Sequence, residues 1–154
     1  MTRYEPPDAL RSPRYTGVRT FARCPHVADS LDDVDVAVVG VPFDTGTTMR
    51  PGARFGPEAI RSASVMLRPY NPAQETAVFG AISVVDRGDL AVTPQNGERT
   101  AGQIAEQLVP VVAAGAALLV VKRPLGCWVA VRHAPQQQAV GLGDGLRHGY
   151  GPVR

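Results

Sequence analysis

The chain has 154 residues, of which 44% are hydrophobic and 19% charged, a composition that fits one globular domain and excludes a disordered chain. A formal net charge of +2 is too small to indicate a nucleic-acid-binding protein. The first residues hold no apolar signal core, and the longest apolar run, Leu108 to Val121, is broken by Pro110 and Gly115. We therefore expect a soluble cytoplasmic protein, in which Cys24 and Cys127 are reduced.

Residues 1–33 show little periodicity and predict an N-terminal arm that lies on a larger body or on a neighbouring subunit. A β-branched apolar run from Val34 to Val41 is typical of a buried parallel strand. A loop of turn residues follows, up to Gly52. Gly56-Pro57-Glu58 is then typical of a helix start, and Pro69 ends that helix.

The pattern of strand and helix continues up to residue 121. We expect a second strand over 81–86 with a turn at 87–89, a helix over about 98–114, and a third strand over 116–121. This alternation predicts an α/β fold with a parallel sheet. The apolar side chains expected to face inward are Ile60, Ala63 and Leu67 in the first helix and Ile104, Leu108, Val111 and Val112 in the second.

Residues 122–154 differ from the rest of the chain. They contain six glycines and a net charge of +4, whereas residues 1–121 carry a net charge of −2. We expect an irregular basic tail in which Trp128 to Val131 forms at most a short strand. A basic arm for an acidic partner or nucleic acid is the weaker alternative, because the arginines are not interleaved with aromatic residues.

The residues from Pro13 to Val121 resemble the front part of a ureohydrolase of the agmatinase branch of the arginase superfamily. The most specific segment runs from Gly40 to Arg61 and contains Val-Pro-Phe-Asp-Thr-Gly-Thr-Thr-Met-Arg-Pro-Gly followed by a Gly-Pro-Glu helix start. Pro13 to Val18, Leu67 to Pro72 and Val84 to Asp89 continue the resemblance in the expected order. One departure is Met49, which stands where the family usually has Asn.

The resemblance implies a partial three-layer α/β/α arginase-like fold. It also implies hydrolysis of a guanidino compound to urea and an amine, with two manganese ions that lower the pKa of a bridging water. The family's metal ligands lie in the motifs Gly-Gly-Asp-His-Ser, Asp-Ala-His-x-Asp and Asp-x-Asp-x-x-Asp-Pro, and this sequence contains none of them. We therefore assign no catalytic residue and no metal ligand, and expect no cofactor in this chain.

A change of reading frame would explain why the resemblance stops at Val121. Read one base earlier, the codons of Cys127-Trp128-Val129 contain Leu-Gly, with which the missing motif would begin, although that frame does not continue into Asp-His-Ser. Fifteen Arg against one Lys also fits a GC-rich gene, in which shifted frames stay open. The predicted division is thus an arm (1–33), a truncated arginase-like α/β domain (34–121) and a basic tail (122–154) that a frame shift would explain.

The loop from Thr47 to Phe55 is the best remaining functional candidate, and its substrate-loop residues would be Thr48, Arg50 and Arg54. The alternative is a rigid loop that anchors the first helix. Asp86 and Asp89 fit a turn whose carboxylates bind backbone amides better than a metal site. For His26, packing of the arm is the favoured role, and for His133 and His148 solvent exposure.

The functional expectation is therefore an agmatinase-like ureohydrolase fold that is inactive as this chain alone. The alternative is a non-catalytic subunit or interaction module that docks on a full-length relative. The expected partners are a guanidino small molecule and a further copy or relative of the chain, with no nucleic acid and no membrane. We also expect marginal stability, because a sheet of about three strands leaves an edge unpaired.

Overall fold

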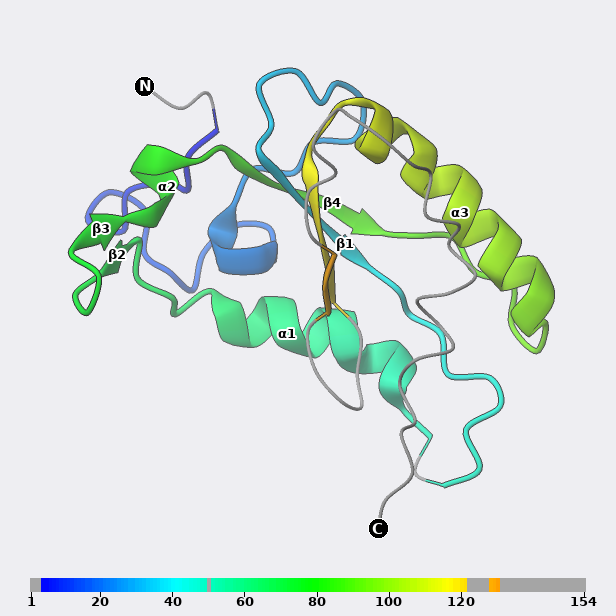
Figure 1. Cartoon of the computed structure of the whole chain (residues 1–154). Helices are drawn as coiled ribbons and strands as arrows, with labels where there is room; N and C mark the ends of the chain where they lie inside the picture. Colours follow the sequence, from blue (N-terminus) through cyan, green and yellow to red (C-terminus); the bar gives the residue numbers. More distant parts are fainter. Residues whose placement is uncertain (1–3, 50, 122–127, 131–154) are drawn as a thin grey trace, which may run out of the picture.

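The computed structural model describes residues 4–49, 51–121 and 128–130, and its centre is a four-stranded sheet with the strand order β4-β1-β5-β6 (Figure 1). The strands are β1 (Val36–Gly40), β4 (Val84–Asp89), β5 (Ala117–Val121) and β6 (Trp128–Ala130). β1 pairs in parallel with β4 on one side and with β5 on the other. The predicted parallel sheet is confirmed, and its first strand lies in the middle.

Two helices cover opposite faces of this sheet (Figure 1). They are α1 (Gly56–Ser64) and α3 (Gly97–Ala113). The remaining elements are small: the 3₁₀ turns η1 (Phe21–Arg23) and η2 (Ala53–Phe55), the hairpin β2 (Tyr70–Asn71) and β3 (Thr76–Ala77), and the single turn α2 (Val78–Ala81). The result is the predicted three-layer α/β/α arrangement.

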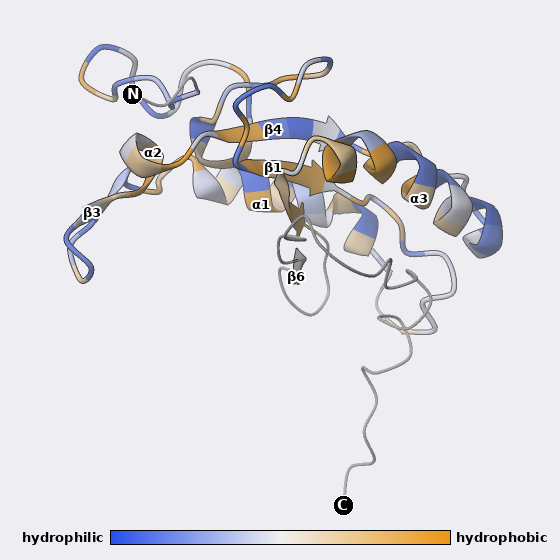
Figure 2. Cartoon of the chain, turned by 45° about the horizontal axis from the view of Figure 1, so that its top comes forward, coloured by the Kyte–Doolittle hydropathy of each residue, from blue (hydrophilic) through white to orange (hydrophobic). Residues whose placement is uncertain are grey.

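The apolar side chains form one cluster on each face of the sheet. In the hydropathy colours of Figure 2, the central strand β1 is hydrophobic. The α3 side holds Leu31, Val34, Ala37, Val85, Val111 and Ala116. The α1 side holds Ala22, Cys24, Val38, Val84 and Val121. Since both clusters contain residues from the first 33, the arm packs into the cores of this chain. The division into three parts otherwise stays a prediction.

The inward faces of both helices differ in part from the prediction. In α1, Ala63 is exposed and Leu67 lies beyond the helix end with 51% exposure, whereas Arg61 is buried. Arg61 occupies the inward face of α1 because it forms an ion pair there, and hydrophobic periodicity cannot predict a buried ion pair. In α3, Leu108 and Val111 are buried as expected, but Val112 is 58% exposed. The inward stripe of α3 extends instead to Thr100, whose hydroxyl donates to the carbonyl of Thr93.

Most of the predicted tail, including His133 and His148, lies outside the described residues. The described part of it is β6, which pairs antiparallel with β5 and corresponds to the short strand expected near Trp128. Among the described residues, no helix has the length and hydropathy that a membrane crossing needs.

Candidate functional site at the carboxyl edge of the sheet

The carboxyl ends of the three parallel strands lie side by side. Gly40 is in register with Asp89 on β4 and with Val121 on β5. Because the strand order reverses at β1, two loops leave this edge toward opposite faces, the arrangement at which open α/β sheets bind ligands. The loops are residues 41–55 and 90–96, and the Gln95 amide donates to Thr45 Oγ1 at 3.1 Å between them.

Asp44 holds the first of these loops in shape. Its side chain is almost fully buried. Oδ2 accepts from the backbone amide of Gly52 at 2.8 Å, and Oδ1 accepts from Arg54 Nε at 2.7 Å and Nη2 at 2.6 Å. Thr47 also donates its amide and hydroxyl to the Asp44 carbonyl. Asp44 therefore closes the loop that connects β1 to α1.

The candidate residues of this loop lie in different environments. Arg54 is bound to Asp44 while half of its side chain stays exposed. The hydrogen bond from Arg54, supported by the Gly52 amide, lowers the pKa of Asp44 to about 2, and the same contact raises the pKa of Arg54. Thr48 is exposed and has no hydrogen bond to another described residue. Arg50 lies outside the described residues.

A second arginine–carboxylate cluster lies below α1, where Arg61 and Asp86 are buried and the Asp89 side chain is 40% exposed. Arg61 donates from Nε and Nη2 to Asp86 at 2.7 and 3.0 Å, and from Nη1 to Asp89 at 2.5 Å. Burial lowers the pKa of the Arg61 guanidinium, but the hydrogen bonds that it donates to both carboxylates outweigh this effect, and the pKa is raised. Two planar contacts to one carboxylate fix the orientation of both groups, so the cluster sets the position of α1 on the sheet.

Asp86 also attaches the N-terminal arm to the sheet. Its Oδ2 accepts from the amide of Phe21 at 2.7 Å, and Oδ1 from Gly88 at 2.8 Å. Its backbone carbonyl accepts from Val27 and from His26 Nδ1. The interpretation as a carboxylate that binds backbone amides is thus confirmed for Asp86 but is wrong for Asp89, whose carboxylate accepts from Arg61 instead. His26 is exposed and holds the arm through its hydrogen bond to the Asp86 carbonyl. The ion pair with Arg61 is an addition that the sequence did not reveal.

These carboxylates do not form a metal site. Asp44 is bound to Arg54, and both Asp86 and Asp89 are bound to Arg61. Among the described residues, no three His, Cys, Asp or Glu side chains gather in a way that could hold a metal ion. A cation would have to displace an arginine at each of these positions, so the residues present do not fit the pair of manganese ions that the resemblance implies.

Sequence reasoning missed Asp44 and Arg61 as parts of this edge. Asp44 had a usable signal, because an Asp at the start of a Gly-rich loop commonly accepts backbone amides. Arg61 had none, since charged residues within a helix are normally exposed. Sequence reasoning also missed the close approach at Gly40. A Cβ added there would fall 1.9 Å from Asp89 Oδ1 and 2.8 Å from Pro57 Cβ.

Comparisons with known proteins agree with this geometry. The Arginase family model matches residues 34–121. A guanidinobutyrase of Pseudomonas aeruginosa is 46% identical over 95 residues, which cover 60% of this chain and 30% of that protein. The mitochondrial agmatinase of Gallus gallus is 40% identical over 136 residues, which cover 84% of this chain and 40% of that protein.

A solved structure supports the same fold. Proclavaminate amidino hydrolase from Streptomyces clavuligerus superimposes with a TM-score of 0.66 at 39% identity, over 71% of this chain and 36% of that one. The chain thus spans less than half the length of each of these relatives. The matched family model covers more than half of the 154 residues and includes the whole parallel sheet, so the chain belongs to the arginase family.

Proposed function

We propose that this chain carries the first part of a hydrolase for a guanidino compound, and that the loop over residues 41–55 forms one wall of the substrate entrance. The observation that carries the proposal is the position of this loop at the carboxyl edge of the sheet, where the strand order reverses. The names of the relatives support the substrate class, since they refer to guanidinobutyrate-, agmatine- and amidino-directed enzymes. Thr48, Arg50 and Arg54 would line this wall.

The 154-residue chain by itself is proposed to be inactive. Activation of water at neutral pH needs carboxylate and imidazole ligands around the metal ions. The sequence lacks the three family motifs that supply them, and the described carboxylates of the edge are bound to arginines. We therefore derive no catalytic step through manganese for this chain.

The other shifted reading frame, not the one that contains Leu-Gly at Cys127-Trp128-Val129, supplies one of the missing motifs in part. When each codon is read from its second base, the stretch that encodes Lys122 to Leu125 becomes ARC-GNC-CNC-TNG, where R is a purine and N is any base. If the codons of Arg123, Pro124 and Leu125 are CGA, CCA and CTC, the last three of these triplets encode Asp-His-Ser. Few amino-acid triplets have this property, and this one stands directly after β5, where the family motif belongs. The two glycines before Asp-His-Ser are not restored. We propose that residues 122–154 are read out of the family's frame.

Sequencing the gene across codons 115–160 tests the frame directly, where CGA, CCA and CTC at codons 123–125 are expected. The enzymatic test measures urea from agmatine and guanidinobutyrate with manganese. The purified chain is expected to give no more urea than a metal-free blank. A matched protein, expressed after removal of one base at codon 122, is expected to release urea if the remaining motifs follow in that frame. Urea release by the 154-residue chain after repurification contradicts the proposal.

The second candidate is a non-catalytic module that docks on a full-length relative. The N-terminal arm supports this candidate, because two of its apolar side chains are exposed to solvent, Leu10 by 94% and Val18 by 81%. Size-exclusion chromatography of the chain mixed with the Pseudomonas guanidinobutyrase tests it, and co-elution that is lost on Leu10→Ser with Val18→Ser supports docking. Separate elution at all ratios contradicts it.

A further inference from the structure

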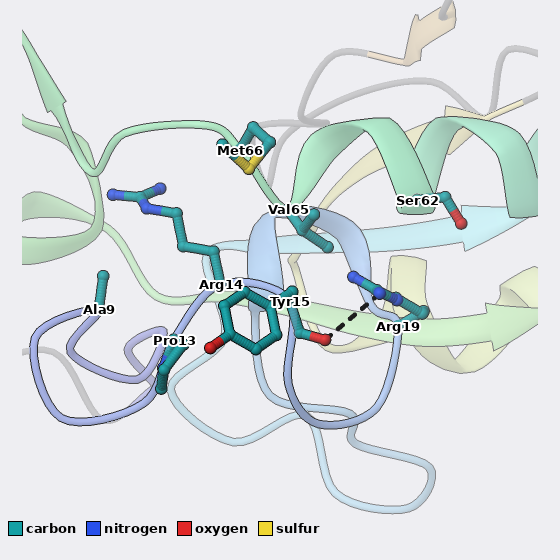
Figure 3. A pocket seen from close by; sticks show the side chains of 8 residues that line it. All are labelled: Ala9, Pro13, Arg14, Tyr15, Arg19, Ser62, Val65 and Met66. Atoms are coloured by element: carbon teal, nitrogen blue, oxygen red, sulfur yellow. Dashed lines mark hydrogen bonds between the residues drawn. The ribbon is translucent and has the colours of Figure 1, made fainter.

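A cleft lies between the N-terminal arm and the end of α1 (Figure 3). Its volume is about 580 Å³. The arm forms one side, and Ser62, Val65 and Met66 form the other (Figure 3). On the arm side, Tyr15 lies between two arginines, Arg14 and Arg19. The cleft shares no residue with the loop from Thr47 to Phe55.

The two arginines of the cleft have neutral partners. Arg14 Nη1 donates to the carbonyl of Leu67, and Arg19 Nη2 donates to the carbonyl of Tyr15 over a long 3.4 Å. No carboxylate of the described residues pairs with either of them. A guanidinium has more donors than these contacts use. Both side chains therefore keep donors and a full positive charge available to a ligand in the cleft.

Other arginines of the described chain provide the contrast. Arg54 and Arg61 are each bound to a carboxylate at 2.7 Å or closer. The arm around the cleft is different, since even its buried Arg23 donates to neutral oxygens, those of Pro7 and Ser12. The nearby Asp8 carboxylate accepts from the Leu10 amide. The cleft is thus a concentration of positive charge that the described side chains leave uncompensated.

Both sides of the cleft also hold apolar groups. Tyr15 on the arm side is 76% exposed, and on the α1 side Met66 is 69% exposed while Val65 is buried. An aromatic ring and a thioether next to guanidinium groups suit a ligand with an anionic end and a short apolar body. The Ser62 hydroxyl adds one polar group on the α1 side.

We propose that this cleft binds a small anion in which a carboxylate or phosphate group is attached to a short apolar body. The anionic oxygens accept from Arg14 and Arg19, and the apolar body packs against Tyr15 and Met66. Charge-assisted hydrogen bonds to two guanidinium groups are the strongest contacts available to such a ligand. The site would be filled independently of hydrolysis, so its test does not depend on the proposed function.

Calorimetric titration of the full chain at constant ionic strength tests the site, with phenyl phosphate, inorganic phosphate and succinate as probes. Saturable binding of phenyl phosphate is expected, weaker binding of inorganic phosphate shows the contribution of the apolar groups, and succinate separates carboxylate from phosphate ligands. Arg14→Gln and Arg19→Gln are each expected to weaken binding about tenfold or more. The control is Arg99→Gln, which removes an exposed arginine on α3 and is expected to bind like the parent chain.

Arg14→Gln also removes the contact to Leu67, so its fold is checked by circular dichroism, and Arg19→Gln decides the result if that variant unfolds. The proposal is overturned by the absence of saturable binding, by equal affinities in Arg19→Gln and Arg99→Gln, or by displacement of phenyl phosphate with chloride at equal ionic strength, which would show an adventitious ion only.

Discussion

The two arginine–carboxylate clusters of this chain have the same chemistry in different surroundings. Arg61 and Asp86 join α1, β4 and the arm below the surface, with the partly exposed Asp89 as a second partner of Arg61, whereas Arg54 and Asp44 hold one loop with the arginine half exposed. When a buried charge loses its partner, water cannot take the partner's place, whereas water can solvate an exposed charge. We therefore expect the buried cluster to decide whether the chain folds and the exposed one to decide only the shape of the loop.

The largest effect is expected for Asp86→Ala, which leaves the buried guanidinium of Arg61 with one partner and removes the acceptor of the Phe21 amide. Breaking a buried pair in this way costs about 3–5 kcal/mol of the free energy of unfolding. Urea denaturation followed by circular dichroism measures it. In the control, Asp86→Leu combined with Arg61→Met replaces charges by apolar groups and is expected to recover much of the loss. A loss for Asp86→Ala below about 1 kcal/mol contradicts the importance of the cluster.

The next effect concerns Gly40, where β1 approaches the same cluster. A Cβ at this position would collide with Asp89 Oδ1 and Pro57 Cβ. Because Asp89 is held by Arg61, Gly40→Ala is expected to lower the free energy of unfolding by about 1–3 kcal/mol. Gly97→Ala is the matched control, since nothing lies within 4 Å of a Cβ there. Equal unfolding midpoints for the two variants would show that Asp89 moves aside freely.

A smaller and local effect is expected for Asp44 as a function of pH. Its pKa is lowered from 3.8 to about 2 in the folded chain. Its contact with Arg54 therefore contributes fully above about pH 4, and the contribution is lost as the pH falls from there through 2. The protection factors for amide exchange at Gly52 and Arg54, which donate to Asp44, are expected to fall over this window. Asp44→Asn should show fast exchange at every pH with an unchanged unfolding midpoint, and a global loss of stability would contradict the loop-only role.

The smallest effect is the reactivity of Cys24, which lies beside the buried cluster. Burial, together with the nearby charge of Asp86, raises the pKa of its thiol to about 12. In a Cys127→Ser background, Cys24 is expected to react slowly with a disulfide reagent at pH 8 and rapidly after unfolding. Asp86→Asn should accelerate the reaction of the folded chain, whereas Asp44→Asn should not. Fast reaction in the parent chain would show that the arm opens readily.

Local sequence determined much of the fold. The valine-rich runs became β1 and β5 close to their expected bounds, because β-branched residues suit buried strands. The strand β4 runs from Val84 to Asp89, three residues later than expected, so the turn predicted over 87–89 is part of the strand. The second helix starts after Asn96, whose side chain accepts from the Arg99 amide, a cap that its residue type favours. The loop around Arg54 could also be singled out, since its Gly, Pro and Thr residues are unusual at this density.

Tertiary structure alone decided the rest. The position of β1 between β4 and β5 follows from crossovers on opposite faces, and no local pattern contains that information. The burial of Arg61 depends on Asp86 and Asp89, which lie 25 and 28 residues away in the sequence. The cleft of Arg14 and Arg19 exists because the arm folds back on α1. Periodicity records which residues are apolar along one segment, whereas partners for buried charges come from separate segments and appear only when these segments pack together.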